Sequence, residues 1–375
     1  KNKKYNVFFV PTFIIDKNIS NIFKIINYLD KKNCVFKEHY LSLYDILYSN
    51  FHFLRKERYR TRFTYYKGWD VSKFIHEEIN NLDSFLVQTA ITNYLFSKNL
   101  YHKNIKIEKV IDWFENQSVD KGWNMGFRKY YPNVQHVGYQ AFPYYPSHMH
   151  NLTASHEEKF KVIPKKIISI GKAYTKLKKE FFPKVKISTG PALNYTGVFK
   201  NIKKKIKIKN LLILSGIKAI DEKLIKWILF LIKKDNQIKV TIKPHPILPL
   251  NNLSEFKNIK NLNQISITNK NLSEILNFTK NTICTGPTSG VIESVIKKCY
   301  LIFPVFDCHD KSYLKQLKVS KKFYKLVYSK EEFSLEMIKI NKNKINFTSK
   351  KTQNEKIKNY LFEKITDKNM ELFYK

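Results

Sequence analysis

The sequence predicts an α/β protein built on parallel sheets, and three observations lead to this fold class. Apolar runs rich in β-branched residues recur along the chain, and most of them end in Gly, Pro or small polar residues. Segments with apolar residues at helical spacing, such as 74–100 and 221–233, lie between the runs. Continuous apolar strands are typical of sheets covered on both faces, and strand–helix alternation is typical of parallel sheets.

The chain is long enough for two domains. It has 375 residues, and a prior of ~150 residues per domain predicts about two. The basic stretch 200–209 interrupts the alternation, after which a buried strand begins again. We therefore predict two Rossmann-like domains, 1–200 and 201–335, followed by a helical tail, 336–375.

In the first domain, we expect a buried parallel strand over 4–10, where an apolar run ends at Pro11. A helix follows over 18–29, and a second strand and loop over 35–43. Residues 74–100 form one or two helices. The remaining expected strands of this domain cover 107–111, 133–139 and 166–171.

In the second domain, the alternation is more regular. Expected strands cover 210–216, 237–242, 265–267, 281–286 and 300–305. Expected helices cover 221–233, 272–278 and 288–298, and the tail contains helical stretches near 332–340 and 354–373. In such sheets, ligands bind at the carboxyl ends of the strands.

The charge is strongly basic, with 68 Lys and Arg against 31 Asp and Glu and a formal net charge of +37. Such a charge is compatible with nucleic acid, an anionic membrane or an anionic small substrate. Lys, Asn, Ile, Phe and Tyr are all enriched, which is typical of an A+T-rich genome, so much of the charge is explained as Lys on solvated faces. Arginine occurs only at Arg55, Arg58, Arg60, Arg62 and Arg128, and the alternation of 58, 60 and 62 predicts one face of an extended segment or a solvated loop.

Several function classes lack their sequence signals. No P-loop, G-x-G-x-x-G, H-E-x-x-H or metal-ligand spacing is found, and no RNP-like strand. The four cysteines show no C-x-x-C spacing, which fits a reducing cytoplasm. No apolar run approaches the ~18–20 residues that span a bilayer, and no secretory signal peptide is recognised.

In the second domain, polar motifs follow the ends of several expected strands. Lys243-Pro244-His245-Pro246 presents an imidazole between two prolines, which suits a phosphate or a turn that satisfies its own backbone. Thr288 and Ser289 precede a helix, where free N–H groups and hydroxyls form an anion site or a simple N-cap. Glu274, between these motifs, suits ribose hydroxyls or a favoured helix-start carboxylate. We count Ser215 and Gly216, at the end of strand 210–216, with the same binding residues.

The first domain holds a group of acidic, amide, Arg and imidazole side chains near expected strand ends. The group comprises Asp112, Glu115, Arg128, Gln135 and His136. Glu115 is the candidate general base or nucleophile, with surface carboxylates as the alternative for it and for Asp112. His136 could equally be a core histidine. Arg128 is a candidate for a carboxylate or phosphate because its planar fork binds such groups bidentately.

The order of these motifs resembles the GT-B glycosyltransferases that use CMP-activated ulosonic acids, the bacterial sialyltransferases and Kdo transferases of surface-carbohydrate biosynthesis. His245-Pro246 matches the family's His-Pro motif, Thr288-Ser289 its hydroxyl pair, and Gln135-His136 the Gln-His motif of Kdo transferases. Glu274 falls where the family has a ribose-binding acid. Glu115 falls where the family has its catalytic acid, although Glu-Asn-Gln departs from the usual surroundings.

The resemblance implies a GT-B fold, two Rossmann-like domains with a cleft between them, and transfer of a sialic-acid-like sugar or Kdo. His245, Thr288 and Ser289 would stabilise the phosphate of departing CMP. Glu274 would hold ribose, and Glu115 would deprotonate the acceptor or attack the anomeric carbon. Arg128 or His136 would meet the sugar carboxylate or phosphate. The CMP-sugar would be a co-substrate, with no metal or other cofactor.

The expected partners are the donor and a glycan, glycolipid or glycoprotein acceptor. The expected location is the cytoplasm, with the basic charge favouring peripheral contact with the anionic inner face of the membrane. Three alternatives remain at this stage. One is a transferase with another donor, either a UDP- or GDP-sugar glycosyltransferase or a CDP-polyol phosphotransferase. The others are a basic nucleic-acid-binding protein, which we disfavour, and a non-catalytic scaffold of a glycan-assembly complex.

Overall fold

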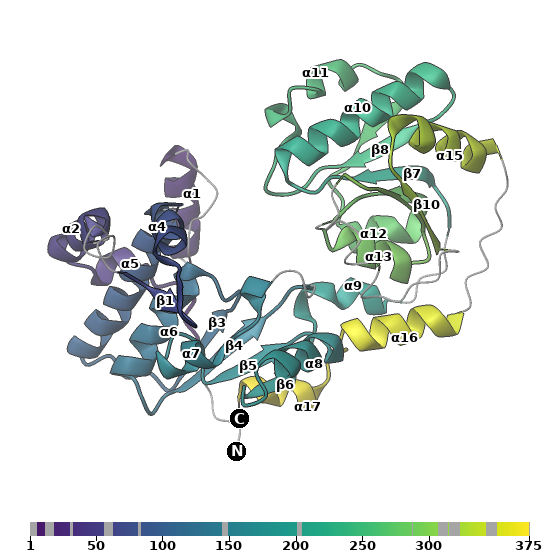
Figure 1. Ribbon diagram of the computed structural model, residues 1–375. Helices are drawn as coiled ribbons and strands as arrows, with labels where there is room; N and C mark the ends of the chain where they lie inside the picture. Colours follow the sequence, from purple (N-terminus) through teal and green to yellow (C-terminus); the bar gives the residue numbers. More distant parts are fainter. Residues whose placement is uncertain are drawn as a thin grey trace. The chain divides into compact units, whose positions relative to one another are not determined.

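The computed structural model describes residues 6–11, 19–30, 33–55, 63–81, 84–144, 149–200, 205–286, 288–306, 314, 323–342 and 351–374. These residues form an α/β protein whose larger sheets have six and four strands (Figure 1). The chain divides into two compact units. One comprises Lys1–Gln140, His150–Ile168 and Lys178–Ile187, and the other Ala141–Met149, Ser169–Leu177 and Ser188–Lys375. The predicted α/β class with Rossmann-like sheets is confirmed, whereas the domain boundaries at 200 and 335 stay a prediction.

The six-stranded sheet is parallel throughout, in the order β12-β11-β10-β7-β8-β9. Its strands are β7 (Ile208–Ile213), β8 (Val240–Lys243), β9 (Ile265–Ile267), β10 (Thr279–Ile283), β11 (Tyr300–Pro304) and β12 (Tyr324–Val327). Numbered from β7 and read from β9, the order is 3-2-1-4-5-6, the doubly wound arrangement. The winding reverses between β7 and β10, and ligands of such sheets bind beyond the carboxyl ends of the strands at this reversal.

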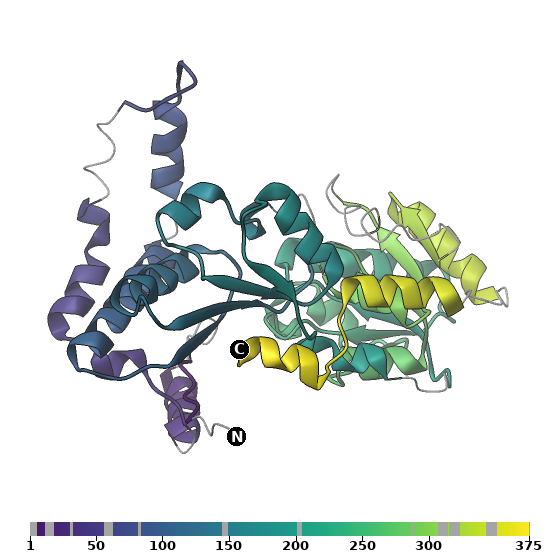
Figure 2. The ribbon, with the colours of Figure 1, turned by 90° about the horizontal axis from the view of Figure 1, so that it is seen from below.

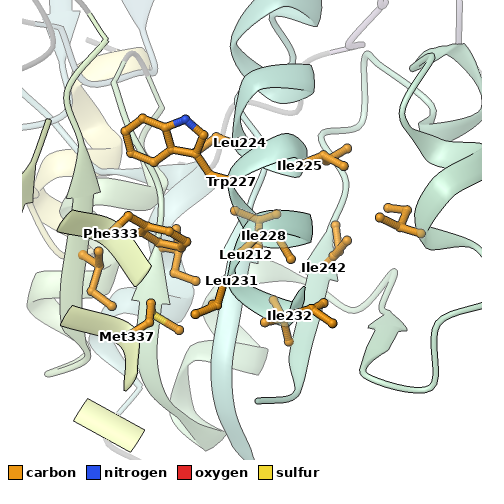
Figure 3. Packing of buried hydrophobic residues seen from close by; sticks show 14 of the residues in the cluster. Leu212, Leu224, Ile225, Trp227, Ile228, Leu231, Ile232, Ile242, Phe333 and Met337 are labelled. Carbon is orange, nitrogen blue, oxygen red and sulfur yellow. The ribbon is translucent and has the colours of Figure 1, made fainter. Parts of the chain in front are cut away.

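Apolar packing explains why these strands read as continuous hydrophobic runs. Leu211 and Leu212 of β7 are fully buried because helices cover both faces of a parallel sheet. Helix α10 (Lys218–Lys234) presents a buried stripe from Leu224 to Ile232, and α15 (Lys330–Lys342) adds Phe333 and Met337 to the same core (Figure 3). The other elements on this sheet are η4 (Leu250–Asn252), α11 (Phe256–Ile259), α12 (Leu272–Ile275), η5 (Leu276–Phe278) and α13 (Gly290–Ile296).

The four-stranded sheet has the order β3-β4-β5-β6. Its strands are β3 (Lys109–Trp113), β4 (Gln135–Gln140), β5 (Lys166–Ser169) and β6 (Ile187–Thr189), and β3 pairs with β4 in parallel. The connecting elements are α6 (Ser118–Tyr130), η2 (Met149–Asn151), α7 (Ser155–Lys159) and α8 (Lys172–Phe181). After β6 come η3 (Leu193–Tyr195) and α9 (Thr196–Phe199).

Helices precede this sheet in the sequence. They are α1 (Ile19–Asp30), η1 (Lys37–Tyr40), α2 (Leu43–Asn50), α4 (Ser72–Asn81) and α5 (Ser84–His102), with a hairpin of β1 (Tyr65–Tyr66) and β2 (Trp69–Asp70) between α2 and α4. Figure 2 shows the hairpin and α4 from below. In the ranges that the structure describes, no helix is both long and apolar enough to cross a membrane.

The last part of the chain returns to the region after β5. Helix α16 (Lys351–Leu361) is followed by α17 (Asp367–Met370) and η7 (Glu371–Phe373). The Glu363 amide donates to the Ile170 carbonyl at 2.7 Å, and the Ala192 amide donates to the Glu363 carbonyl at 2.9 Å. At Gly171, an added Cβ would lie 2.0 Å from the Leu361 carbonyl oxygen, so only glycine allows this approach.

Two expectations for the first part of the chain are wrong. The apolar run before Pro11 is not a buried strand: Val7, Phe8 and Phe9 are exposed, and only Phe9 forms an isolated bridge, to Cys34. Residues 35–43 are not a strand either, because they form η1 and then enter α2. The Ser42 side chain accepts from the Asp45 amide while the Asp45 carboxylate accepts from the Ser42 amide, a capping box that starts α2.

Helix α6 was not among the expected elements, and it contains two glycines, Gly122 and Gly126. The structure explains both glycines by close packing against α5. A Cβ at Gly122 would lie 1.8 Å from the Ala90 carbonyl oxygen, and one at Gly126 would lie 1.9 Å from Ser97 Oγ. The helical penalty of glycine is therefore offset by an approach that any side chain would prevent. Strands β6 and β12 were also missed, and the helix expected over 288–298 begins at Gly290 and ends at Ile296.

Candidate functional site

A tight turn follows β7 at Ser215 and Gly216, and a buried aspartate holds it. Asp221, on the first turn of α10, accepts through Oδ1 from the Ser215 amide at 2.7 Å and from the Ser215 hydroxyl at 2.8 Å. Its Oδ2 accepts from the Gly216 amide at 2.9 Å. Gly216 has a φ of +84°, which favours glycine. Burial raises the pKa of Asp221 above its ordinary value. The hydrogen bonds from Ser215 and Gly216 lower the pKa, but the effect of burial is larger.

His245 lies directly against this turn. The Leu214 amide donates to the Lys243 carbonyl at 3.1 Å, which joins the ends of β7 and β8. A Cβ on Gly216 would lie 2.6 Å from His245 Nδ1. Burial lowers the pKa of His245 below its ordinary value, an effect that the nearby Asp221 carboxylate opposes.

The hydrogen bond to the His245 ring determines which of its two nitrogens carries the proton in the neutral form. The Ile247 amide donates to His245 Nδ1 at 3.3 Å. An imidazole that accepts at Nδ1 in its neutral form carries its proton on Nε2. His245 can therefore present Nε2–H as a hydrogen-bond donor at neutral pH without carrying a charge.

A cavity of about 490 Å³ opens beside this loop, at the carboxyl ends of β8 and β9. The cavity has polar groups from the Lys243 loop and from two amides, and apolar walls between them. It is lined by Lys243, Pro244, His245, Pro246, Pro249, Leu250, Asn251, Phe256, Ile267 and Asn269. Its volume lies within the range of about 300–1,000 Å³ that small-molecule sites occupy.

The predicted hydroxyl pair lies beyond the carboxyl end of β10. A Cβ on Gly290 would lie 3.0 Å from Ile213 Cγ2, so the start of α13 packs on the last residue of β7. The Gly290 amide donates to Thr288 Oγ1 at 3.2 Å, and the Ser289 hydroxyl donates to Glu293 Oε1 at 3.3 Å. Burial raises the pKa of Glu293 to about 7. Both hydroxyls thus make local bonds around the start of α13.

The structure brings part of the predicted donor-binding set together. Ser215, Gly216, Lys243, His245 and Pro246 belong to adjoining turns at the ends of β7 and β8, while Thr288 and Ser289 follow β10, the strand next to β7. Glu274 lies on α12 with its side chain exposed. Sequence reasoning missed Asp221, for which the signal was an acid shortly after a strand that ends in Ser-Gly.

In the other unit, Asp112 and His136 form a buried pair. His136 Nε2 lies 3.6 Å from Asp112 Oδ1, and their side chains are almost fully buried. Among the described residues, no hydrogen-bond partner reaches the carboxylate oxygens of Asp112, the ring nitrogens of His136 or the amide of Gln140. Asp112 lies near the carboxyl end of β3, whereas Gln135 and His136 open β4. The strand expected over 133–139 is thus present as β4, and the catalytic role of His136 and the binding role of Gln135 stay predictions.

Glu115 follows β3 and is held by its neighbours. Its Oε1 accepts from Trp113 Nε1 at 2.6 Å, and its Oε2 accepts from Gln117 Nε2 at 2.8 Å. Asp120 accepts through Oδ2 from the amides of Glu115 at 2.9 Å and Gln117 at 3.0 Å. Burial, followed by the charge of Asp112, raises the pKa of Asp120 to about 7. The segment after β3 therefore carries one oriented carboxylate and one that resists ionisation.

Arg128 has a different role in the structure from the one that its rarity suggested. Its NH1 and NH2 donate to the two carboxylate oxygens of Glu158 at 2.7 and 2.9 Å, and NH1 also donates to the Ile163 carbonyl at 3.2 Å. The guanidinium fork is thus bound to a carboxylate within the protein. Arg58, Arg60 and Arg62 lie outside the described residues, so the alternation predicted there stays a prediction.

No family model matches the sequence, and no curated protein matches it. Among solved structures, a mutant of S. aureus TarM in complex with fondaparinux, α-GlcNAc-glycerol and UDP is similar at 15% identity and a TM-score of 0.44, covering 75% of this chain and 58% of that chain. Acinetobacter baumannii MurG is similar at 12% identity and a TM-score of 0.44, covering 81% and 88%. The C-terminal domain of a glycosyl transferase group 1 family protein (LpcC) from Francisella tularensis is similar at 13% identity and a TM-score of 0.28, covering 46% and 89%. The chain spans less than two thirds of the TarM chains.

Proposed function

We propose that this protein is a glycosyltransferase of the GT-B type that transfers a ulosonic acid from a CMP donor to a surface glycan or glycoconjugate. One observation carries the proposal. His245 is packed against the Ser215–Gly216 turn at the end of β7, and it lines a cavity of about 490 Å³. The 3-2-1-4-5-6 sheet supports ligand binding at these strand ends.

The chemistry of the cavity suits a nucleotide. Phe256 and Ile267 offer apolar surface to a base, Asn251 and Asn269 offer amide donors and acceptors, and Lys243 and His245 offer donors to a phosphate. A neutral His245 with a proton on Nε2 donates a hydrogen bond to a phosphate oxygen. As the bond between the sugar and CMP breaks, negative charge develops on the phosphate, and a fixed donor is worth most at that point.

The remaining roles are assigned by the resemblance and stay part of the proposal. Glu274 would hold ribose, and Thr288 and Ser289 would assist at the phosphate. Glu115 would act as general base or nucleophile, and Asp112 and His136 would complete the catalytic set. We assign the preference for CMP and for a ulosonic acid on the same basis, and we propose that no resident metal or cofactor is required.

The test is a nucleotide screen by thermal shift, with CMP, CDP, UDP, GDP and the free nucleosides, followed by transfer assays with the protecting class of donor in the presence and absence of EDTA. The proposal expects CMP to raise the melting temperature and transfer to persist in EDTA. Protection by UDP or GDP without CMP would move the protein to another donor class. Protection by CDP with transfer of a polyol phosphate would assign a CDP-polyol phosphotransferase.

A further inference from the structure

Helix α2 buries two polar side chains, Asp45 and Ser49, and exposes its apolar ones. Asp45 and Ser49 are 8% and 2% exposed, and His52, which follows the helix, is also buried. The spacing of these residues, four and then three, places them on one helical face. Leu43 and Tyr44 are each 73% exposed. This distribution is the reverse of that of a helix packed on an apolar core.

Directed hydrogen bonds fix this orientation of α2 against α5 (Figure 1). Asn99 Nδ2 of α5 donates to Asp45 Oδ2 at 2.8 Å, and Gln88 Nε2 of α5 donates to Asn50 Oδ1 at 2.9 Å. The capping box between Ser42 and Asp45 holds the same carboxylate. A rotation of α2 that buried its leucines would break both bonds to α5 and leave the amides of Asn99 and Gln88 without these partners.

The outward face forms one continuous apolar stripe, here called the α2 apolar face. It comprises Leu43, Tyr44, Leu47 and Tyr48 of α2, together with Phe51 and Leu54 directly after the helix, all of which are exposed. Single exposed apolar residues are normal on a protein surface, but a contiguous set of them marks an interaction site. Two of the six are tyrosines, whose rings are apolar and whose hydroxyls remain hydrated.

A cation, Arg55, adjoins one end of this face. The Arg55 guanidinium lies 3.8 Å from the centre of the Tyr48 ring, and its NH2 donates to the Tyr48 carbonyl at 2.7 Å. In the sequence, residues 55–62 contain Arg55, Lys56, Arg58, Arg60 and Arg62 against a single acid, Glu57. In the sequence, four of the five arginines of the whole chain therefore follow α2 within 12 residues.

We propose that the α2 apolar face docks this protein on an anionic lipid bilayer. A helix with an apolar face, interfacial aromatic residues and adjoining cations lies in the membrane plane, with its apolar side chains at the headgroup boundary. Arg55, next to this face, then binds a lipid phosphate, and a positive net charge attracts the whole molecule to the surface. The formal charge of +37 supplies this complementarity. The proposal is independent of the proposed transfer reaction, because docking requires no sugar donor.

The hairpin of β1 and β2, like the α2 apolar face, combines exposed aromatic residues with a cation, and this composition also favours a lipid bilayer as the partner. Tyr65, Tyr66 and Trp69 are exposed, and the Lys67 ammonium lies 5.7 Å from the centre of the Tyr66 ring. Tyrosine, tryptophan and lysine together are typical of the interface between lipid and water. An acidic protein as the partner would explain the cations, but it would not explain the exposed leucines and tyrosines of the α2 apolar face.

The test is flotation of the full-length protein with vesicles of phosphatidylcholine alone or phosphatidylcholine mixed with phosphatidylglycerol. Leu43→Glu/Leu47→Glu places two carboxylates on the α2 apolar face. Leu335→Glu, on α15, is the matched control because Leu335 is 66% exposed and lies in the other unit. Circular dichroism verifies that each variant is folded.

The wild type and Leu335→Glu should float with the anionic vesicles and not with phosphatidylcholine alone. The double variant should lose this partitioning by about tenfold or more, and raising salt well above ~0.1 M should weaken it for the wild type. Flotation of the double variant at the wild-type level would overturn the proposal. A wild type that floats with neither kind of vesicle would also overturn it. If light scattering then shows a dimer that is lost only in the double variant, the α2 apolar face would be assigned to contact with a second copy of the chain.

Discussion

Gly216 and His245 approach so closely that no side chain fits between them. The position of a Cβ on Gly216 is 2.6 Å from His245 Nδ1 and 2.8 Å from its Cγ. The turn after β7 is therefore in direct steric contact with the loop after β8, so a displacement of the turn should also displace the imidazole. Asp221, buried behind the turn, holds this unit through both of its carboxylate oxygens.

Gly216→Ala should displace His245 and weaken nucleotide binding. The methyl group meets the imidazole, and the positive φ adds strain of about 1–2 kcal/mol. Gly68→Ala is the matched control, because Gly68 has a φ of +86° but no atom within 4 Å of its Cβ position. Calorimetric titration with CMP and thermal melts should show lost affinity only for Gly216→Ala. Equal losses in both variants would attribute the effect to backbone strain alone.

His245→Ala should reduce transfer while leaving the fold intact. Removal of one fixed donor to a developing anion lowers turnover by about 10²–10³-fold. The side chain lines a cavity and is half-buried, so melting should change little. Steady-state kinetics of His245→Ala and of the control His156→Ala, an exposed histidine on α7, check this. Full activity of His245→Ala would remove the phosphate role.

Glu115→Gln should lower turnover by about 10²–10⁴-fold if Glu115 is the base or nucleophile. The amide has the same shape, and its oxygen still accepts from Trp113 Nε1. Its NH2 group would face Gln117, whose side-chain amide can turn its oxygen towards it, so the local geometry should persist. Asp112→Asn is the informative companion, since no hydrogen bond from the described residues reaches that buried carboxylate. Single-turnover kinetics on both variants separate them, and a loss confined to Asp112→Asn would move the catalytic assignment to the Asp112–His136 pair.

Asp120→Asn should flatten the dependence of stability on pH. The pKa of Asp120 is about 7 when folded against 3.8 ordinarily. Between these values, the folded protein holds a proton that the unfolded chain has lost, so stability is full below 3.8 and falls as the pH rises towards 7. The fall is at most about 4 kcal/mol.

Urea unfolding of wild type and Asp120→Asn across this pH window measures the difference in slope. Glu293 has a raised pKa of about 7 as well, so part of the wild-type slope should remain in the variant. A slope in Asp120→Asn as steep as that of the wild type would show that Asp120 ionises normally in the folded protein.

The sequence was most informative where burial is continuous. Strand β7 and helix α10 were predicted because strands and helices within a doubly wound sheet have apolar patterns that local spacing reveals. The Lys243–Pro246 turn was recognised because its prolines mark the end of a strand. By contrast, the run before Pro11 has the same composition as a buried strand but is exposed, and composition alone does not show which neighbour a strand finds.

Long-range partners explain the other differences. Asp221 reads as an ordinary helix-start acid until the positive φ of Gly216 turns two amides towards it. Arg128 reads as a free anion binder until the fold brings Glu158 to its fork. In α6, Gly122 reads as a helix breaker until α5 packs on it. Each of these depends on a contact made in three dimensions, which a single sequence does not display.

The bonds of Glu363 to the segments after β5 and β6 can form only after most of the chain has been synthesised. Ile170 and Ala192 leave the ribosome long before Glu363, whose backbone amide and carbonyl bond to the Ile170 carbonyl and the Ala192 amide. Until Glu363 emerges, the Ile170 carbonyl and the surface under Leu361 remain open to water or to a chaperone. On a ribosome stalled before α16, proteases should therefore cleave the four-stranded sheet. Synthesis and release of the downstream segment should protect it.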